Sequence, residues 1–166
     1  MGGVVTLGAA RLPLVRKRLD RIPDSVQEQV LVGQTGMRVR CAAETLSAEQ
    51  IARYGSSFKR NQTFGVTAGV EYTVLGMLFT FDAPARGTGA YLVVPLEHDR
   101  VSTAPIVLFE VVDAAVPADW RVARSSDEVR MLPDEMQSPY FFDDLSEQEP
   151  SALQALRRVL SRSRGP

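Results

Sequence analysis

Apolar and polar residues alternate with a period of two along most of the chain after residue 36, a pattern typical of β-strands with one buried face. The segment MRVRC at 37–41 shows it most clearly, because its two arginines fall on one face and its apolar residues on the other. The run at 106–112, IVLFEVV, is almost continuously apolar and stops at Asp113. We therefore expect 106–112 to be the central strand around which the others are arranged.

Further strands are predicted where the alternation returns between turn signals, at 66–81, 90–96, 120–124 and 128–132. Within 66–81 the phase of the alternation shifts near Gly76, which predicts a β-bulge that bends the strand. The polar residues Ser125, Ser126 and Asp127 predict the turn of a hairpin between the last two strands.

Two helices have signals of their own. Ser47 followed by Gln50 is a capping box for a short helix that reaches Tyr54 and ends at Gly55. Near the C-terminus, 149–160 carries a single apolar stripe suited to packing against a sheet. The stripe consists of Leu153, Leu156, Val159 and Leu160.

Together these elements predict a mainly β (α+β) fold. We expect a small SH3-like curved sheet or partly open barrel of five or six antiparallel strands, with a short helix after the first strand and a C-terminal helix packed on the sheet. The expected organisation is a basic N-terminal extension at 1–36, a β-rich domain at 37–148, the C-terminal helix at 149–162 and a tail at 163–166.

Composition narrows the chemistry. The 166 residues are 45% hydrophobic and 23% charged, which is ordinary for a globular domain. Cys41 is the only cysteine and His98 the only histidine, so an internal disulfide is excluded and a structural zinc site is not expected. Carboxylate-bound magnesium or calcium stays open, although no EF-hand spacing is present, and we assign no metal site and expect no cofactor. Cys41 is interpreted as a small core residue. No apolar run approaches the roughly 18 residues of a membrane span, so we expect a cytoplasmic protein that does not enter membranes.

Charge is unevenly distributed although the formal net charge is only −1. Residues 127–149 contain eight acidic residues and a single basic one, Arg130. Within this segment, YFFDD at 140–144 places three aromatic residues directly before two aspartates. Such a segment favours a basic partner, and the competing interpretation is a solvated acidic loop that offsets the basic helix after it.

A polar loop at 55–65 gives an alternative function. Its aromatic residues are interleaved with basic and amide side chains, the ingredients of base stacking on single-stranded nucleic acid. The corresponding surface would use Arg38, Arg40, Lys59 and Arg60 with Phe58 and Phe64. Against it, the two phenylalanines also suit a role in pinning the loop to the barrel, and binding modules of this kind are usually basic overall.

Catalysis is not expected. His98 lies in the charged turn EHDR without a recognisable nucleophile or oxyanion site. The neighbouring carboxylates of Asp143 and Asp144 would point to opposite sides of an extended chain. A pocket that gathers His98 with two or more convergent polar groups would instead favour an enzyme.

Four segments in order resemble a family of small uncharacterised bacterial proteins whose members are similar to toxin immunity proteins. The segments are MRVRC at 37–41, VTAGVEYTVLGM at 66–77, LFEVVDAAVPADW at 108–120 and YFFDDL at 140–145. The resemblance covers about 37–160. It implies a non-catalytic cytoplasmic protein with an SH3-like or related curved sheet, and it brings no assigned active site.

These observations make an immunity protein the leading hypothesis, with a protein toxin such as a nuclease as the partner. Acidic groups can stand in for phosphates while aromatic anchors exclude water around them. The expected partner-binding residues are Tyr140, Asp143, Asp144, Asp134, Glu135 and Glu147. Nucleic acid is the less favoured partner.

Overall fold

The computed structural model describes residues 36–54, 58–83 and 87–163, all of which belong to one compact unit, Gly33–Pro166. The N-terminal extension predicted at 1–36 lies outside the described residues except for Gly36. The predicted tail lies outside them except for Ser163, which ends the last helix.

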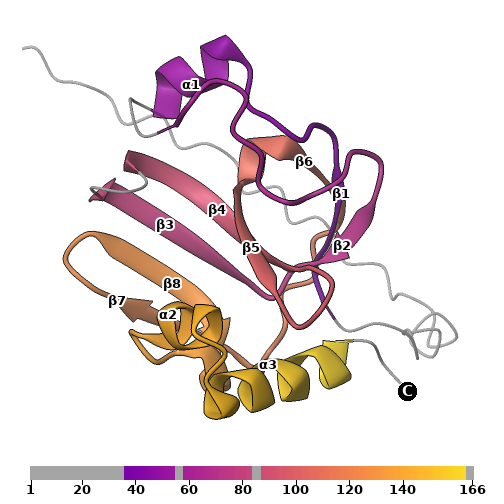
Figure 1. The fold of residues 1–166 in the computed structure, drawn as a ribbon, viewed down its shortest axis with the longest axis vertical. Coiled ribbons are helices and arrows are strands. Elements are labelled where there is room, and N and C mark those ends of the chain that lie inside the picture. The colour runs from indigo at the N-terminus through magenta and orange to yellow at the C-terminus, as the bar shows by residue number, and fades with distance from the viewer. Residues whose placement is uncertain (1–35, 55–57, 84–86, 164–166) are drawn as a thin grey trace, which may run out of the picture. The chain divides into compact units, whose positions relative to one another are not determined.

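The described residues form eight strands in two open antiparallel sheets (Figure 1). The strands are β1 (Arg38–Cys41), β2 (Glu71–Thr73), β3 (Gly76–Ala83), β4 (Gly87–Pro95), β5 (Val101–Pro105), β6 (Phe109–Asp113), β7 (Trp120–Arg124) and β8 (Glu128–Pro133). The smaller sheet has the order β2-β1-β6 and the larger one β5-β4-β3-β8-β7.

Three helices and two 3-10 turns complete the described part of the chain. They are α1 (Ala48–Tyr54), α2 (Phe141–Ser146), α3 (Pro150–Ser163), η2 (Ile106–Leu108) and η3 (Asp134–Met136). The mainly β class, the short helix after the first strand and the C-terminal helix on the sheet are confirmed, with more strands than the five or six expected. None of these helices is long and apolar enough to cross a membrane.

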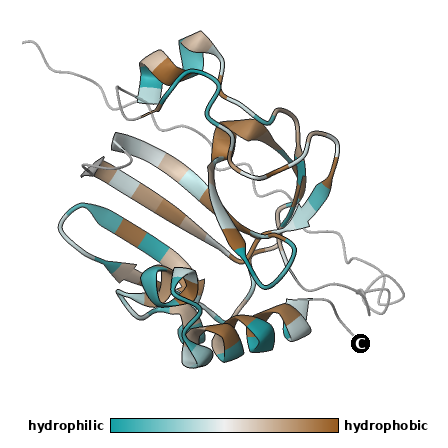
Figure 2. Ribbon diagram, viewed as in Figure 1, coloured by the Kyte–Doolittle hydropathy of each residue, from teal (hydrophilic) through white to brown (hydrophobic). Residues whose placement is uncertain are grey.

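Strand β4 of the larger sheet lies between two core clusters. Tyr91 and Val93 belong to the core cluster that includes α2 and α3, whereas Leu92 and Val94 belong to the cluster that includes β1. All four side chains are at most 1% exposed. Because successive residues of a strand point to opposite faces, β4 is covered on both sides. Apolar residues recur along α3, which covers one face of the sheet (Figure 2).

The prediction that 106–112 forms the central strand is wrong. Ile106–Leu108 forms a 3-10 turn, and the strand that follows, β6, is an edge of the smaller sheet. Val111 is 53% exposed there. The apolar run is the place where the chain leaves β5 of the larger sheet at Pro105 and enters the smaller sheet, so one hydrophobic segment is divided between two environments.

The strand predicted at 66–81 is likewise two strands in two sheets. The Val74 amide donates to Met37 O in the smaller sheet, and the next amide, of Leu75, donates to Val93 O in the larger one. Gly76 follows at once and lies against β8, where a Cβ atom would be 2.1 Å from Leu132 Cδ2. The predicted bulge at Gly76 is therefore a crossing between sheets that requires a residue without a side chain.

Local signals were predicted correctly. The Ser47 amide donates to Gln50 Oε1 at 2.8 Å and the Gln50 amide donates to Ser47 Oγ at 3.2 Å, which is the capping box of α1. The hairpin β7–β8 closes around 125–127, and α3 buries Leu156 and Val159 as expected. Cys41 is 1% exposed, and this confirms its place in the core.

Candidate functional site

The helix α2 has one buried and one exposed side. Phe141 and Leu145, four residues apart, are 3% and 8% exposed and anchor the helix in the core. Tyr140, Asp143 and Glu147 fall on the opposite side because residues three and four apart share a helical face, and all three are exposed. The core residues thus fix the direction in which the acidic residues point.

Two aspartates occupy the first turn of α2, Asp143 and the half-buried Asp144. Negative charge there is favoured by the helix dipole. Within the described part of the chain, neither carboxylate nor that of Glu147 is in an ion pair. We call Tyr140, Asp143, Asp144 and Glu147 the acidic face of α2.

The other two predicted partner-binding residues, Asp134 and Glu135, lie in η3 and are engaged by arginines. Arg121 Nε is 3.6 Å from Asp134 Oδ1. Arg162 donates through Nη1 and Nη2 to the two oxygens of Glu135 at 2.6 and 3.0 Å. This hydrogen-bonded guanidinium lowers the pKa of the Glu135 carboxyl below its usual value. Glu135 therefore serves to attach α3 to η3.

The residues of the alternative nucleic-acid surface have different environments. Arg38 and Arg40 both approach Glu71, at 3.5 and 2.6 Å. Phe58 and Phe64 pack edge to face with ring centroids 5.7 Å apart, and each contacts the core, while the adjacent Lys59 and Arg60 are exposed. The aromatic rings are thus used to pin the loop, and no observation here favours base stacking.

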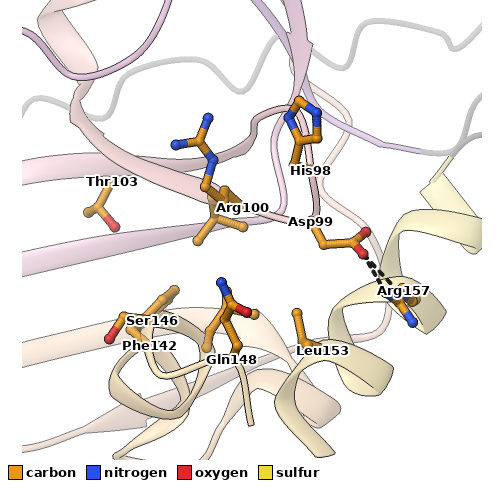
Figure 3. Close-up of a pocket in the computed structure, with 11 residues that line it drawn as sticks. His98, Asp99, Arg100, Thr103, Phe142, Ser146, Gln148, Leu153 and Arg157 are labelled. Atoms are coloured by element: carbon orange, nitrogen blue, oxygen red, sulfur yellow. Dashed lines mark hydrogen bonds and ion pairs between the residues drawn. The ribbon is translucent and has the colours of Figure 1, made fainter. Parts of the chain in front are cut away.

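Sequence reasoning missed a cleft at the turn between β4 and β5 (Figure 3). It has a volume of about 540 Å³ and is lined by the turn 98–100, by part of β5, by one side of α2 and by Gln148 and part of α3. We call it the His98 cleft. Its two walls come from 98–103 and 142–157, which are far apart in the sequence. No local sequence pattern could therefore have predicted it.

His98 stands at the rim of this cleft. Its side chain is 82% exposed, and its Nδ1 is 3.9 Å from Glu97 Oε2. Ser146 lies on the opposite wall of the cleft (Figure 3), where its hydroxyl donates to Asp143 O at 2.8 Å. Polar groups line the cleft with His98, but they do not converge on it, because its imidazole points away from Ser146 and Gln148 on the opposite wall (Figure 3). Within the described residues no hydroxyl or thiol is hydrogen-bonded to the imidazole. The polar and charged side chains that line the cleft are suited to binding a ligand.

Two further observations concern metal and thiol chemistry. Within residues 36–54, 58–83 and 87–163 no group of three or more His, Cys, Asp and Glu side chains is placed to hold a metal ion. Burial raises the pKa of the Cys41 thiol, and its Sγ donates to Ala43 O at 3.2 Å. Cys41 is therefore in its protonated, unreactive form at neutral pH.

Comparison with protein-family models, curated proteins and solved structures found no match to this chain. The resemblance to immunity-like proteins therefore stays a prediction.

Proposed function

We propose that this protein is a non-catalytic binding protein of the immunity type, which neutralises a toxic enzyme through the acidic face of α2. The observation that carries the proposal is the exposed stripe of Tyr140, Asp143 and Glu147 on a helix whose other side is buried. Rigid presentation matters because a binding surface that is already ordered loses less conformational entropy on association.

The chemistry of the acidic face suits a cationic partner. A nuclease must hold phosphates, so its active site carries positive charge that carboxylates can occupy in their place. Carboxylates without cations of their own contribute to long-range attraction and speed association at low salt. Tyr140, 67% exposed, supplies the kind of large amphipathic side chain that often dominates the energy of an interface.

Asp134 and Glu135 contribute less to the proposed binding, because their carboxylates already form ion pairs with Arg121 and Arg162. We therefore assign them to the rim of the proposed interface and the acidic face of α2 to its centre. The partner we propose is a protein toxin in the cytoplasm, with a nuclease as the favoured class because its phosphate-binding surface is cationic.

The test is coexpression with the product of the adjacent gene. We expect that product to inhibit growth and this chain to restore it. Asp143→Lys with Glu147→Lys should abolish the restoration, because two repulsive charges then face the cationic partner. Circular dichroism and thermal unfolding establish that the variant remains folded.

The matched control reverses two exposed carboxylates elsewhere, Glu49→Lys in α1 with Glu110→Lys in β6. This variant carries the same change in net charge and should restore growth as the wild type does. Equal behaviour of the two double variants, or a toxic neighbour that this chain does not neutralise, contradicts the proposal. A neighbouring product without toxicity contradicts it too.

A further inference from the structure

A hydrogen-bonded ion pair joins the two walls of the His98 cleft. Arg157 of α3 donates through Nε and Nη2 to a single oxygen, Oδ2 of Asp99, at 2.9 and 2.7 Å (Figure 3). The turn itself is closed by the Leu96 amide, which donates to Arg100 O at 2.8 Å. The turn and α3 thus have a fixed relationship, and a volume of about 540 Å³ is within the range of small-molecule sites.

Backbone strain is concentrated at this cleft. Four described residues other than glycine have positive φ, and three of them line the cleft: His98 at 60°, Asp99 at 55° and Gln148 at 61°. Left-handed conformations disfavour residues with a Cβ and persist where the surroundings impose them, most often at functional sites. His98 and Asp99 form the tight turn between β4 and β5, and Gln148 ends α2, so these backbone conformations fix the positions of residues that line the cleft.

Gln148 has a left-handed backbone conformation at the end of α2. Its amide donates to Leu145 O and the next amide, of Glu149, donates to Asp144 O, which together form a Schellman motif at the end of α2. Glycine is the usual residue at this left-handed position. Here a glutamine occupies it, and its side chain extends from the connection between α2 and α3 toward the β4–β5 turn (Figure 3).

The charges of the cleft are not balanced. Two arginines line it against one aspartate, and Arg157 uses that aspartate. Arg100 is left with only a backbone contact, from Nε to Glu97 O at 3.4 Å, and with no carboxylate partner in the described part of the chain. The acids at 143, 144 and 147 are not among the lining residues. A positive charge remains at the rim.

The floor of the cleft is apolar. Phe142 and Leu153 line it and pack against the core cluster of α2 and α3, and Leu145 is itself part of that cluster. A ligand for this site needs an acidic group, with one oxygen for Arg100 at the rim and the other for the Gln148 amide, and an apolar body for the floor.

We propose that the His98 cleft binds a small organic anion with an apolar body. Arg100 holds the acidic group, and the Gln148 amide fixes the orientation. Phe142 and Leu153 contact the apolar body. In Figure 3 the Arg100 guanidinium points away from Gln148 and Phe142, and binding requires it to turn over the rim. Because Arg100 is exposed, this rotation needs no change in the core. The site goes beyond the protein-binding function proposed for the acidic face of α2 and does not depend on it.

The test uses the full chain labelled with nitrogen-15 and a matched pair of probes, 2-naphthoate and the neutral 2-naphthamide. We expect saturable amide shifts from 2-naphthoate at 98–103 and 142–157. The neutral amide should bind roughly tenfold more weakly, because it cannot form charge-assisted hydrogen bonds with the guanidinium.

Three variants test the roles of Arg100 and Gln148 in binding the probe. Arg100→Gln should weaken 2-naphthoate binding roughly tenfold, to the level of the neutral amide. Arg124→Gln removes an exposed arginine of β7 outside the cleft and should leave binding unchanged. Gln148→Gly should weaken binding although it relieves strain and raises the melting temperature, so loss of fold cannot explain that result.

Several outcomes overturn the proposal. They are no saturable shifts at millimolar probe, equal binding of the two probes, or equal effects of Arg100→Gln and Arg124→Gln. Shifts centred on the exposed side chains of Phe81 and Val122 would mean that the probe binds an apolar sheet surface instead.

Discussion

Gly76 lies so close to Leu132 that a Cβ atom on the glycine would be 2.1 Å from Leu132 Cδ2 and 2.8 Å from the carbonyl oxygen of Met131. The second distance involves backbone of the paired strand β8, which cannot move aside as a side chain can. The chain can thus cross from the smaller to the larger sheet here only because Gly76 has no side chain.

Gly76→Ala should therefore lower the free energy of unfolding by about 3 kcal/mol, because the added methyl group forces β3 and β8 apart. Gly36→Ala is the control, since its nearest neighbour would be at an ordinary 3.8 Å. Urea denaturation of both variants measures the difference. An equal small effect at the two positions would show that β8 accommodates the methyl group.

Gln148→Gly should raise the free energy of unfolding by about 1 kcal/mol, because glycine adopts the left-handed conformation at 61° without steric cost. Gln148→Ala also removes the side chain but keeps the strain, so it should give no such gain. Thermal unfolding of the two variants separates relief of strain from loss of side-chain contacts.

Glu135 should make the stability of the protein depend on pH in the acidic range. Arg162 lowers the pKa of Glu135 in the folded state, so its contribution is fully present above the ordinary value of 4.5 and is lost as the pH falls through the lower folded pKa. Glu135→Gln should cost on the order of 1 kcal/mol at neutral pH and progressively less in acid.

Chemical denaturation of wild type and Glu135→Gln across the acidic range tests this dependence. Glu110→Gln, on an exposed strand without an ion pair in the described residues, should show no comparable trend. A constant difference between wild type and Glu135→Gln at all pH values would contradict the role assigned to the Arg162 contact.

The capping box of α1 should have a measurable effect on stability. Ser47→Ala removes the acceptor of the Gln50 amide and should cost about 1 kcal/mol. Because Ser47 and Gln50 bond reciprocally, the double variant with Gln50→Ala should cost less than the sum of the two single changes. Strict additivity in urea denaturation would show that the two hydrogen bonds act independently.

The candidate sites differ in how far they could be predicted. The sequence marked the acids of the exposed stripe of α2 but did not predict the helix, because Asp143 and Asp144 were expected on an extended chain. The buried side chains of Phe141 and Leu145 decide the direction in which these acids point. The engagement of Glu135 by Arg162, across 27 residues, has no local signature. The His98 cleft is of the same kind, because its walls meet only through packing of the β4–β5 turn against α3.

For the fold, the sequence alone determined what is decided within a few residues: the capping box at Ser47, the β7–β8 hairpin and the amphipathic face of α3. Only the tertiary structure decided which strand is buried on both faces and where the chain changes sheets. The physical reason is that hydrogen bonds of turns and caps form between near neighbours, whereas burial depends on which distant segment covers a strand. The run at 106–112 and the YLVV segment of β4 are both apolar, and packing alone places β6 at an edge of the smaller sheet and β4 inside the larger sheet, covered on both faces.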